Sequence, residues 1–300
     1  MILLLLGVGA CMLALPGLPG RVSQRLPGGE CVPVAVASLI AGWVAVEFGL
    51  VLIALPTVAH ALGFANIADA CHEVLAPLTT APAAVGWLAG AAAAVVGWRL
   101  VAGGRSARAL ARTARADPWL GTHAAHDDFT LVILPTDAPV AYGAPGDPPQ
   151  VVVSQGVVDD LSTDALQAVV AHEVAHHRLK HCRYLALVRG IEHSVGGFGF
   201  VRRSTEAVRH AVEVWADDVA TTYGAPRHAL RGALAQLGGP AAHVQDRRNR
   251  LTGPPDPHPT PLRLLWYSPV AVLTGTAMLL VVDWLTAAHH AAALSSNCAG

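Results

Sequence analysis

Residues 162–182 read STDALQAVVAHEVAHHRLKHC, and the interpretation of the whole chain starts from this stretch. Apolar residues recur at helical spacing from Leu166 to Val174, and Ser162 in front of them is a good N-cap. We therefore expect one helix that begins after Ser162 and runs through about Cys182.

The predicted helix carries two histidines four residues apart, His172 and His176. Residues at this spacing share one face, so both imidazoles can reach a single zinc ion. Glu173 lies about 100° around the helix from His172, beside the metal, where it suits a general base for an activated water molecule. His177 and His181 form a second pair at the same spacing, but Arg178 follows the first of them. We expect this second pair to lie at the surface or to support the metal ligands.

A catalytic zinc takes three protein ligands and a water molecule, so a further ligand must come from elsewhere. A second helix is predicted from near Ser204 to Tyr223. It carries Glu206, His210, Glu213 and Asp217 at helical spacing. One carboxylate can bind the metal while another hydrogen-bonds a ligand histidine. The alternative, a solvated acidic face, is disfavoured by the apolar neighbours Val212, Val214, Trp215 and Ala216, because a buried, unpaired carboxylate is costly.

The composition is typical of a membrane protein with one charged domain. Of 300 residues, 53% are hydrophobic and 14% are charged, against about a quarter charged in soluble domains. The stretch 103–265 holds 17 of the 20 Lys and Arg and 16 of the 21 Asp and Glu. A net charge of −1 gives no electrostatic footprint for nucleic acid. The composition also excludes a disordered chain and a disulfide-stapled mini-protein.

Four apolar segments approach the roughly 20 residues needed to cross a bilayer. Three lie within residues 1–102, at about 2–18, 32–56 and 81–101, and the fourth lies within 266–300. Basic residues follow the first and third segments but are absent between the second and third. This charge distribution predicts extracytoplasmic termini and a cytoplasmic domain from 103 to 265. A cleaved signal peptide is the alternative for the first segment, disfavoured because no basic residue precedes it.

Within the cytoplasmic part, two β-branched runs, Phe129–Leu134 and Gln150–Ser154, are predicted strands. The short, proline-bounded stretch Pro139–Gly143 between them is predicted to be an edge strand, because proline is confined to sheet edges. Residues 238–261 are rich in Gly, Pro, His and Arg and are predicted to form a loop. Its run Arg247–Arg250 is expected to be solvated or to face lipid.

Two features of the apolar segments remain. Cys71 and Cys298 both fall outside the cell under this topology, so a disulfide between them is conceivable. Glu47 lies inside the second segment, where an acidic residue is a candidate for function. The alternative is that Glu47 lies close enough to a membrane interface for its carboxylate to reach water.

Taken together, these residues resemble the integral-membrane gluzincin metallopeptidases. The motif that starts at His172, the membrane setting and the stretch Glu213-Val-Trp-Ala-Asp217 resemble most closely the BlaR/MecR-type family. HtpX-like and CAAX-protease enzymes are relatives of that family. Three further segments resemble elements of these enzymes: 139–143, 151–161, and His258-Pro259 with Arg263.

The resemblance implies a role for each polar residue of the two predicted helices. His172, His176 and Glu213 become the ligands of one Zn²⁺ per chain. Glu173 becomes the general base, and Asp217 the carboxylate that hydrogen-bonds a ligand histidine.

Outside these helices, the resemblance implies a substrate-binding strand that contains Val140, Ala141 and Tyr142. It also implies that His258 or Arg263 stabilises the oxyanion of the reaction. Tyr223 and His210 are rivals for that last role.

The sequence therefore predicts a mostly α membrane protein of about four transmembrane helices with an inserted α+β zinc metalloprotease domain of the gluzincin type. Its expected activity is endopeptidase cleavage of a protein or peptide, for example a transcriptional repressor, at the lipid bilayer. A quality-control protease of membrane proteins and a non-catalytic, zinc-stapled scaffold are the alternatives. No nucleic-acid partner is expected.

Overall fold

The computed structural model describes residues 2–17, 28–64, 82–113, 121–238 and 242–253, with isolated positions 275, 282 and 286. Several predictions lie outside the described residues: the fourth span, the pair Cys71 and Cys298, and the oxyanion candidates His258 and Arg263.

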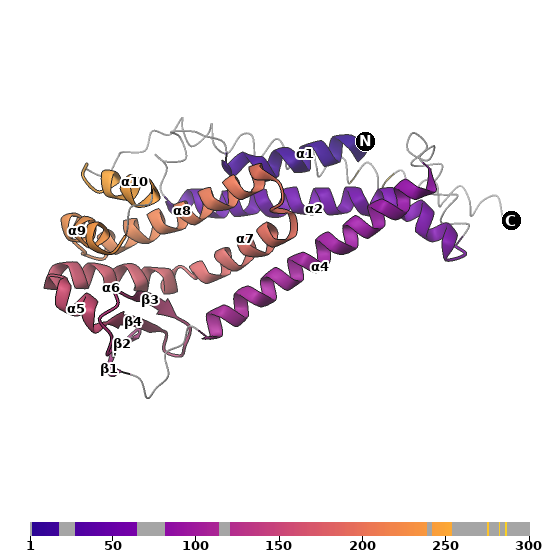
Figure 1. Ribbon diagram of the computed structural model, residues 1–300. Coiled ribbons are helices and arrows are strands. Elements are labelled where there is room, and N and C mark those ends of the chain that lie inside the picture. Colours follow the sequence, from indigo (N-terminus) through magenta and orange to yellow (C-terminus); the bar gives the residue numbers. More distant parts are fainter. Residues whose placement is uncertain are drawn as a thin grey trace.

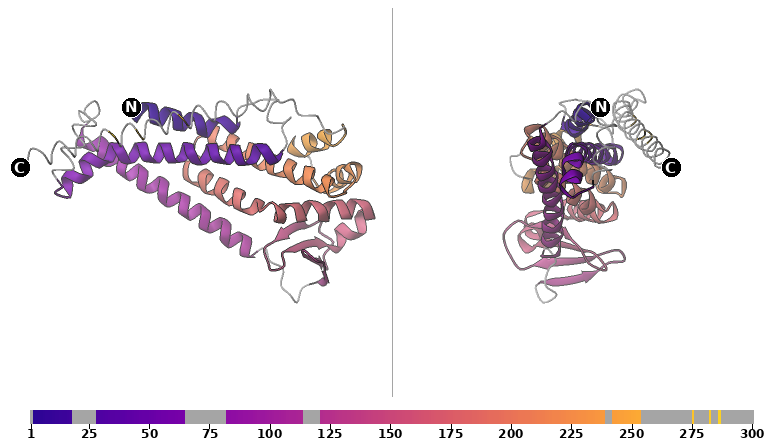
Figure 2. Two further views of the ribbon diagram at one scale, coloured as in Figure 1. Left: turned by 180° about the vertical axis from the view of Figure 1, so that it is seen from behind. Right: turned by 90° about the vertical axis from the view of Figure 1, so that its right-hand side faces the viewer.

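Three long helices lie side by side and form one end of the molecule (Figures 1 and 2). They are α1 (Ile2–Ala14, followed by the 3-10 turn η1, Leu15–Gly17), α2 (Gly28–Ala61) and α4 (Ala83–Thr113). The stretches Cys31–Ala61 and Ala83–Leu110 are long and apolar enough to cross a membrane. Each of the first three predicted spans largely coincides with one of these helices. However, α4 runs on past the predicted end at residue 101, because its Ala- and Arg-rich continuation also favours a helix.

The other end holds a four-stranded sheet in the order β1-β2-β4-β3. The strands are β1 (Thr122–Ala125), β2 (Thr130–Leu134), β3 (Ala141–Ala144) and β4 (Gln150–Ser154). β2 and β4 are parallel, and the other neighbours are antiparallel. β3 is an edge strand, as predicted. β1 was not predicted, because all four of its residues are exposed and its sequence, THAA, lacks an apolar alternation.

Within residues 155–253, as far as the structure describes them, six helices follow the sheet. They are α5 (Gln155–Asp160), α6 (Thr163–Arg178), α7 (His181–Val195), α8 (Gly199–Thr222), α9 (Arg227–Leu237) and α10 (Ala242–Arg250). The prediction of one helix through Cys182 is wrong. Lys180 adopts a left-handed conformation with φ of 55°, and the chain turns there from α6 into α7. The second predicted helix starts earlier than expected, at Gly199.

The main apolar core joins the long helices to α7 and α8. Buried side chains come from α2, α7 and α8: Val32, Ala35, Val36, Leu39, Val188, Ile191, Val195, Val201, Val208 and Val212, with Leu13 of α1. Each such aliphatic side chain contributes roughly 1.5–3 kcal/mol when fully buried. The first half of α2 therefore belongs to the core of the molecule and holds the helices that follow the sheet.

The prediction of a loop over residues 238–261 is wrong in part, because α10 lies within it. Its sequence, AHVQDRRNR, is mostly polar and carries no apolar stripe that a periodicity argument could detect. It is held by the side chains described below and by Leu251, which is buried directly after the helix.

Candidate metal centre

α6 and α8 bring three potential metal ligands to one point. Nε2 of His172 lies 3.4 Å from Oε2 of Glu213, and Nε2 of His176 lies 3.6 Å from Oε1 of the same carboxylate. The two Nε2 atoms are 3.1 Å apart. Two ligands held 2.0–2.1 Å from one tetrahedral ion are about 3.3 Å from each other. The spacing and the donor set, two imidazoles and one carboxylate, therefore fit a zinc ion.

The cap of α6 places the two histidines. Oγ of Ser162 accepts a hydrogen bond from the backbone N–H of Ala165 at 3.3 Å, as expected of an N-cap. From that start, the helix turns His172 and His176 towards α8.

Asp217 orients His172, as the sequence predicted for a carboxylate in this stretch. Its Oδ1 lies 2.9 Å from Nδ1 of the imidazole. The carboxylate therefore occupies the Nδ1 side of the ring and leaves Nε2 to face the cluster.

His181 plays the matching part for His176. The two Nδ1 atoms are 2.9 Å apart, so one ring donates to the other. His181 is only 1% exposed and lies against Trp215, with ring centroids 5.0 Å apart. Nε2 of His181 has no hydrogen-bond partner among the described residues. His181 is therefore a buried support for His176 and not a surface residue.

His177, the other member of the predicted second pair, contacts the sheet. Its Nε2 lies 3.1 Å from the backbone oxygen of Gln150 in β4. A Cβ atom at Gly143 of β3 would come within 2.5 Å of the same nitrogen. A larger residue at position 143 would therefore displace the His177 ring from its contact with Gln150.

Glu173 faces that same strand. The backbone N–H of Gly143 hydrogen-bonds its carboxylate, and burial raises the pKa of Glu173. A raised pKa brings a carboxylate closer to the range in which it can both accept and release a proton near neutral pH. The geometry thus joins the candidate base to the edge of the sheet.

Arg247 of α10 is the functional side chain that the sequence reasoning missed. Its Nε and Nη2 donate to the two carboxylate oxygens of Asp217, both at 2.7 Å, and its Nη1 donates to Oε2 of Glu213 at 3.0 Å. The residue is buried at 8% exposure, so the expectation that this arginine is solvated is wrong. The sequence offered one signal for such a residue: two buried carboxylates need a positive charge beside them to offset the cost of their burial.

The electrostatics of the cluster favour a cation. Burial alone lowers the pKa of His172, but Asp217 and Glu213 outweigh it and raise that pKa to about 10. Burial likewise raises the pKa of Glu213, but His172, His176 and Arg247 bring it down to about 2. The pKa of His176 is lowered to about 3, mainly by burial. The two ionised carboxylates therefore face two cationic groups, Arg247 and the protonated His172, and a metal ion bound at Nε2 of His172 would take the place of that proton.

The register of β3 shows which of its main-chain groups are free. The N–H of Ser154 donates to the carbonyl of Val140 at 2.8 Å. Bonded pairs alternate along an antiparallel ladder, so Val140 and Tyr142 turn their main-chain groups towards β4. Ala141 and Gly143 turn theirs towards the open edge.

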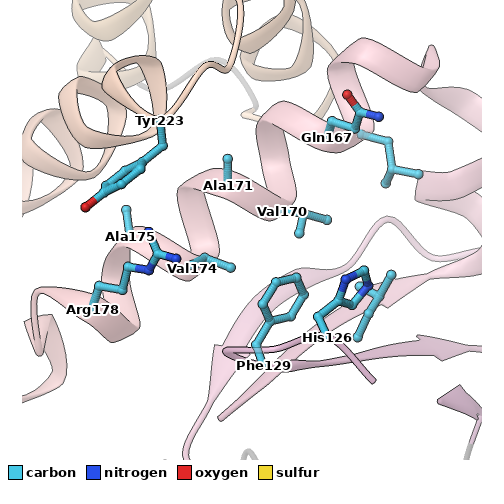
Figure 3. Close-up of a pocket in the computed structure, with 11 residues that line it drawn as sticks. His126, Phe129, Gln167, Val170, Ala171, Val174, Ala175, Arg178 and Tyr223 are labelled. Carbon is cyan, nitrogen blue, oxygen red and sulfur yellow. The ribbon is translucent and has the colours of Figure 1, made fainter. Parts of the chain in front are cut away.

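A cavity of about 430 Å³ lies on the opposite face of α6 and contains none of the metal-site side chains (Figure 3). It is largely apolar, with Phe129, Val170 and Val174 among its walls. Arg178 and Tyr223 lie at one end, with the guanidinium 4.6 Å from the ring centroid. Tyr223 therefore faces away from the cluster.

The last oxyanion candidate among the described residues, His210, also points elsewhere. Its Nε2 lies 2.8 Å from Oδ2 of Asp246 on α10. Glu206 of the same predicted face lies 3.0 Å from Nε2 of His243. These two contacts fasten α10 to α8, so only Glu213 and Asp217 of the predicted acidic face reach the metal site.

Comparison with known proteins identifies the region that holds this geometry. Residues 120–264 match the model of peptidase family M48. The match covers the sheet, the motif helix α6, both acids of α8 and Arg247. It supports a metallopeptidase of the membrane-type gluzincin kind, which is the coarser part of the resemblance found in the sequence. No curated protein and no solved structure matches the chain.

Proposed function

We propose that this chain is a membrane-anchored zinc endopeptidase. The observation that carries the proposal is the convergence of His172, His176 and Glu213 beside Glu173, within a region that matches a metallopeptidase family. Among the described residues the group contains three ligands. Three protein ligands are typical of a catalytic zinc, whereas a structural zinc takes four.

The metal ion and the side chains of the protein supply different parts of the reaction. His172, His176 and Glu213 would hold a zinc ion, which would supply a water molecule of lowered pKa and a Lewis acid for the carbonyl group of the peptide. Glu173 accepts the proton of the attacking water and delivers it to the leaving amine. The N–H of Gly143 holds the carboxylate in position during these transfers.

The substrate is expected to lie along β3. An extended peptide that adds to this edge can pair with the outward main-chain groups of Ala141 and with the carbonyl of Gly143, whose N–H is bound to Glu173. Such pairing places the peptide backbone beside Glu173 without selecting particular side chains. Val140 and Tyr142, which the sequence also assigned to the substrate strand, support the strand from the β4 side.

Arg247 acts as a positioning residue. Three of its N–H groups are already engaged by Asp217 and Glu213, so its charge is committed to holding those acids. The role of oxyanion stabiliser therefore stays assigned, as a prediction, to His258 or Arg263.

Membrane attachment is supported by α2 and α4, which are the two helices in the described part of the chain that are long and apolar enough to span a bilayer. On α4, Trp87, Leu88 and Trp98 are between 53% and 70% exposed, and a lipid environment accounts for large apolar side chains in such positions. We propose the topology predicted from charge, with the metal centre of the 103–265 domain in the cytoplasm. We further propose that the chain is related to the BlaR/MecR-type family and that its substrate is a transcriptional repressor. The competing proposal is a quality-control protease of membrane proteins.

The decisive experiment compares the wild-type protein with Glu173→Gln in detergent. We expect one zinc per chain in both proteins, by elemental analysis. Casein cleavage should fall by a factor of about 10²–10⁴ in the variant, the range attributed to general base catalysis. Zinc in both proteins with equal cleavage contradicts Glu173 as the base. Zinc in both proteins with no cleavage in either favours the scaffold alternative.

A further inference from the structure

The turn between α7 and α8 carries an aromatic side chain that the core does not cover. Phe198 is 60% exposed, and its ring stacks on that of Phe200 at a centroid distance of 5.6 Å. The residues around it, from Ser194 to Val201, include three glycines and no charged side chain. This turn lies far from the metal centre, beside the long helices (Figure 1).

Hydrogen bonds place the end of α7 beside the middle of the two candidate spans. Oγ of Ser194 donates to the carbonyl of Val96 in α4 at 2.7 Å. The same oxygen accepts a hydrogen bond from Nε1 of Trp43 in α2 at 3.1 Å. Earlier in α7, Gly190 packs against Leu100. α7 therefore runs antiparallel to α4 and advances towards its more apolar, N-terminal half.

The first turns of α8 return along α1. Oγ of Ser204 donates to the carbonyl of Ala14 at 3.1 Å and accepts from the N–H of Gly17 at 3.0 Å. These residues form the end of the first apolar helix, which the positive-inside distribution places at the cytoplasmic surface. The turn between Ser194 and Ser204 thus reaches beyond this end, to the depth of the spans.

Two arginines complete the pattern. Arg202 and Arg203 are exposed and follow the aromatic turn directly. On the neighbouring helix α4, Trp98 is 69% exposed, two residues from the hydrogen-bonded Val96. Aromatic side chains followed by basic ones are typical of segments that lie in the membrane interface, with the rings in the acyl boundary and the charges among anionic headgroups.

We propose that the α7–α8 turn is a lipid-binding element that inserts Phe198 into the cytoplasmic leaflet. Arg202 and Arg203 bind the anionic headgroups around it. The partner is the bilayer itself, because the turn continues the apolar surface of α4 at the same depth. This inference rests on the membrane attachment proposed above.

The test uses the full-length protein in nanodiscs of phosphatidylcholine and phosphatidylglycerol. A photo-reactive benzoylphenylalanine replaces Phe198, Trp98 or Tyr223 in three separate variants. Tyr223, at 66% exposure, is the matched control at the other end of α8. We expect lipid adducts from positions 198 and 98 and none from position 223.

Each other outcome is informative. An adduct at 98 without one at 198 overturns the lipid-binding turn and leaves membrane attachment intact. Adducts at neither position overturn both. A protein adduct at position 198 in place of a lipid adduct also overturns the proposal.

The headgroup contacts are tested separately. In anionic nanodiscs, the double variant Arg202→Gln with Arg203→Gln should lower the lipid-adduct yield at position 198 by severalfold. In pure phosphatidylcholine it should leave the yield unchanged. An equal yield in both bilayers contradicts the role of the arginines. Circular dichroism of each variant checks that the helices are retained.

Discussion

The two halves of α8 are held in place by different forces. The first half buries Val201 and Val208 against the long helices, and its stability comes from apolar surface removed from water. The second half carries Glu213 and Asp217, which are held by two histidines and an arginine. Apolar contacts are numerous and interchangeable, whereas each charged contact joins two specific side chains. Substitutions in the first half should therefore affect stability, and those in the second half should affect the metal centre.

The largest effect is expected where a buried charge pair is broken. Arg247→Met leaves Glu213 and Asp217 without their counter-charge, which destabilises a protein by about 3–5 kcal/mol. Thermal unfolding of the chelator-treated protein should show a markedly lower midpoint. Zinc should restore part of it, since the ion can neutralise the same acids.

The neighbouring Arg248 provides the control. It lies on the same helix, and its Nη1 donates only to Gln245 at 3.3 Å. Arg248→Met should change the free energy of unfolding by less than about 0.5 kcal/mol, as for most surface substitutions. Its unfolding midpoint should therefore stay close to that of wild type. Equal midpoints for the two variants would show that the buried pairs do not matter.

A smaller effect is expected at His181, because it acts on the metal only through His176. His181→Ala removes the group that faces Nδ1 of the ligand, and the loss of such a partner weakens metal binding by about 10- to 100-fold. Competition with a zinc chelator measures the change. His181→Asn should recover part of the affinity, because its amide oxygen can accept the same proton. If the Asn variant binds zinc no better than Ala, His181 only fills space.

The smallest effect on the metal is expected in the first half of α8. Val208→Ala removes two buried methyl groups and should lower the free energy of unfolding by about 2 kcal/mol. Zinc affinity and cleavage per folded molecule should stay at wild-type values. A loss of zinc affinity in this variant would show that the two halves of α8 are coupled, which would contradict their separate roles in stability and metal binding.

The same contrast explains how far the sequence could predict the structure. Two β-branched runs identified β2 and β4, a proline-bounded stretch identified the edge strand β3, and helical periodicity identified the helices that carry His172 and Glu213. These features depend on local pattern, which a sequence displays directly. Arg247 could not be placed in the same way, because its helix has no apolar stripe and its partners lie 30 and 34 positions earlier in the chain.

His181 shows the same limit in another form. In one continuous helix, positions 176 and 181 point about 140° apart and their side chains cannot meet. The left-handed conformation of Lys180 breaks the helix and brings the two rings together. Lysine has no preference for that conformation, so no local signal marks the break.

The length of α7 sets the distance between the metal centre and the aromatic turn. It begins at His181, against the ligand His176, and ends just before the aromatic turn at Phe198. Its 15 residues correspond to a rod about 22 Å long. An extended peptide covers that distance with about seven residues. In the proposed membrane-bound arrangement, a substrate segment held at the depth of Phe198 would present its scissile bond about that many residues further along its chain.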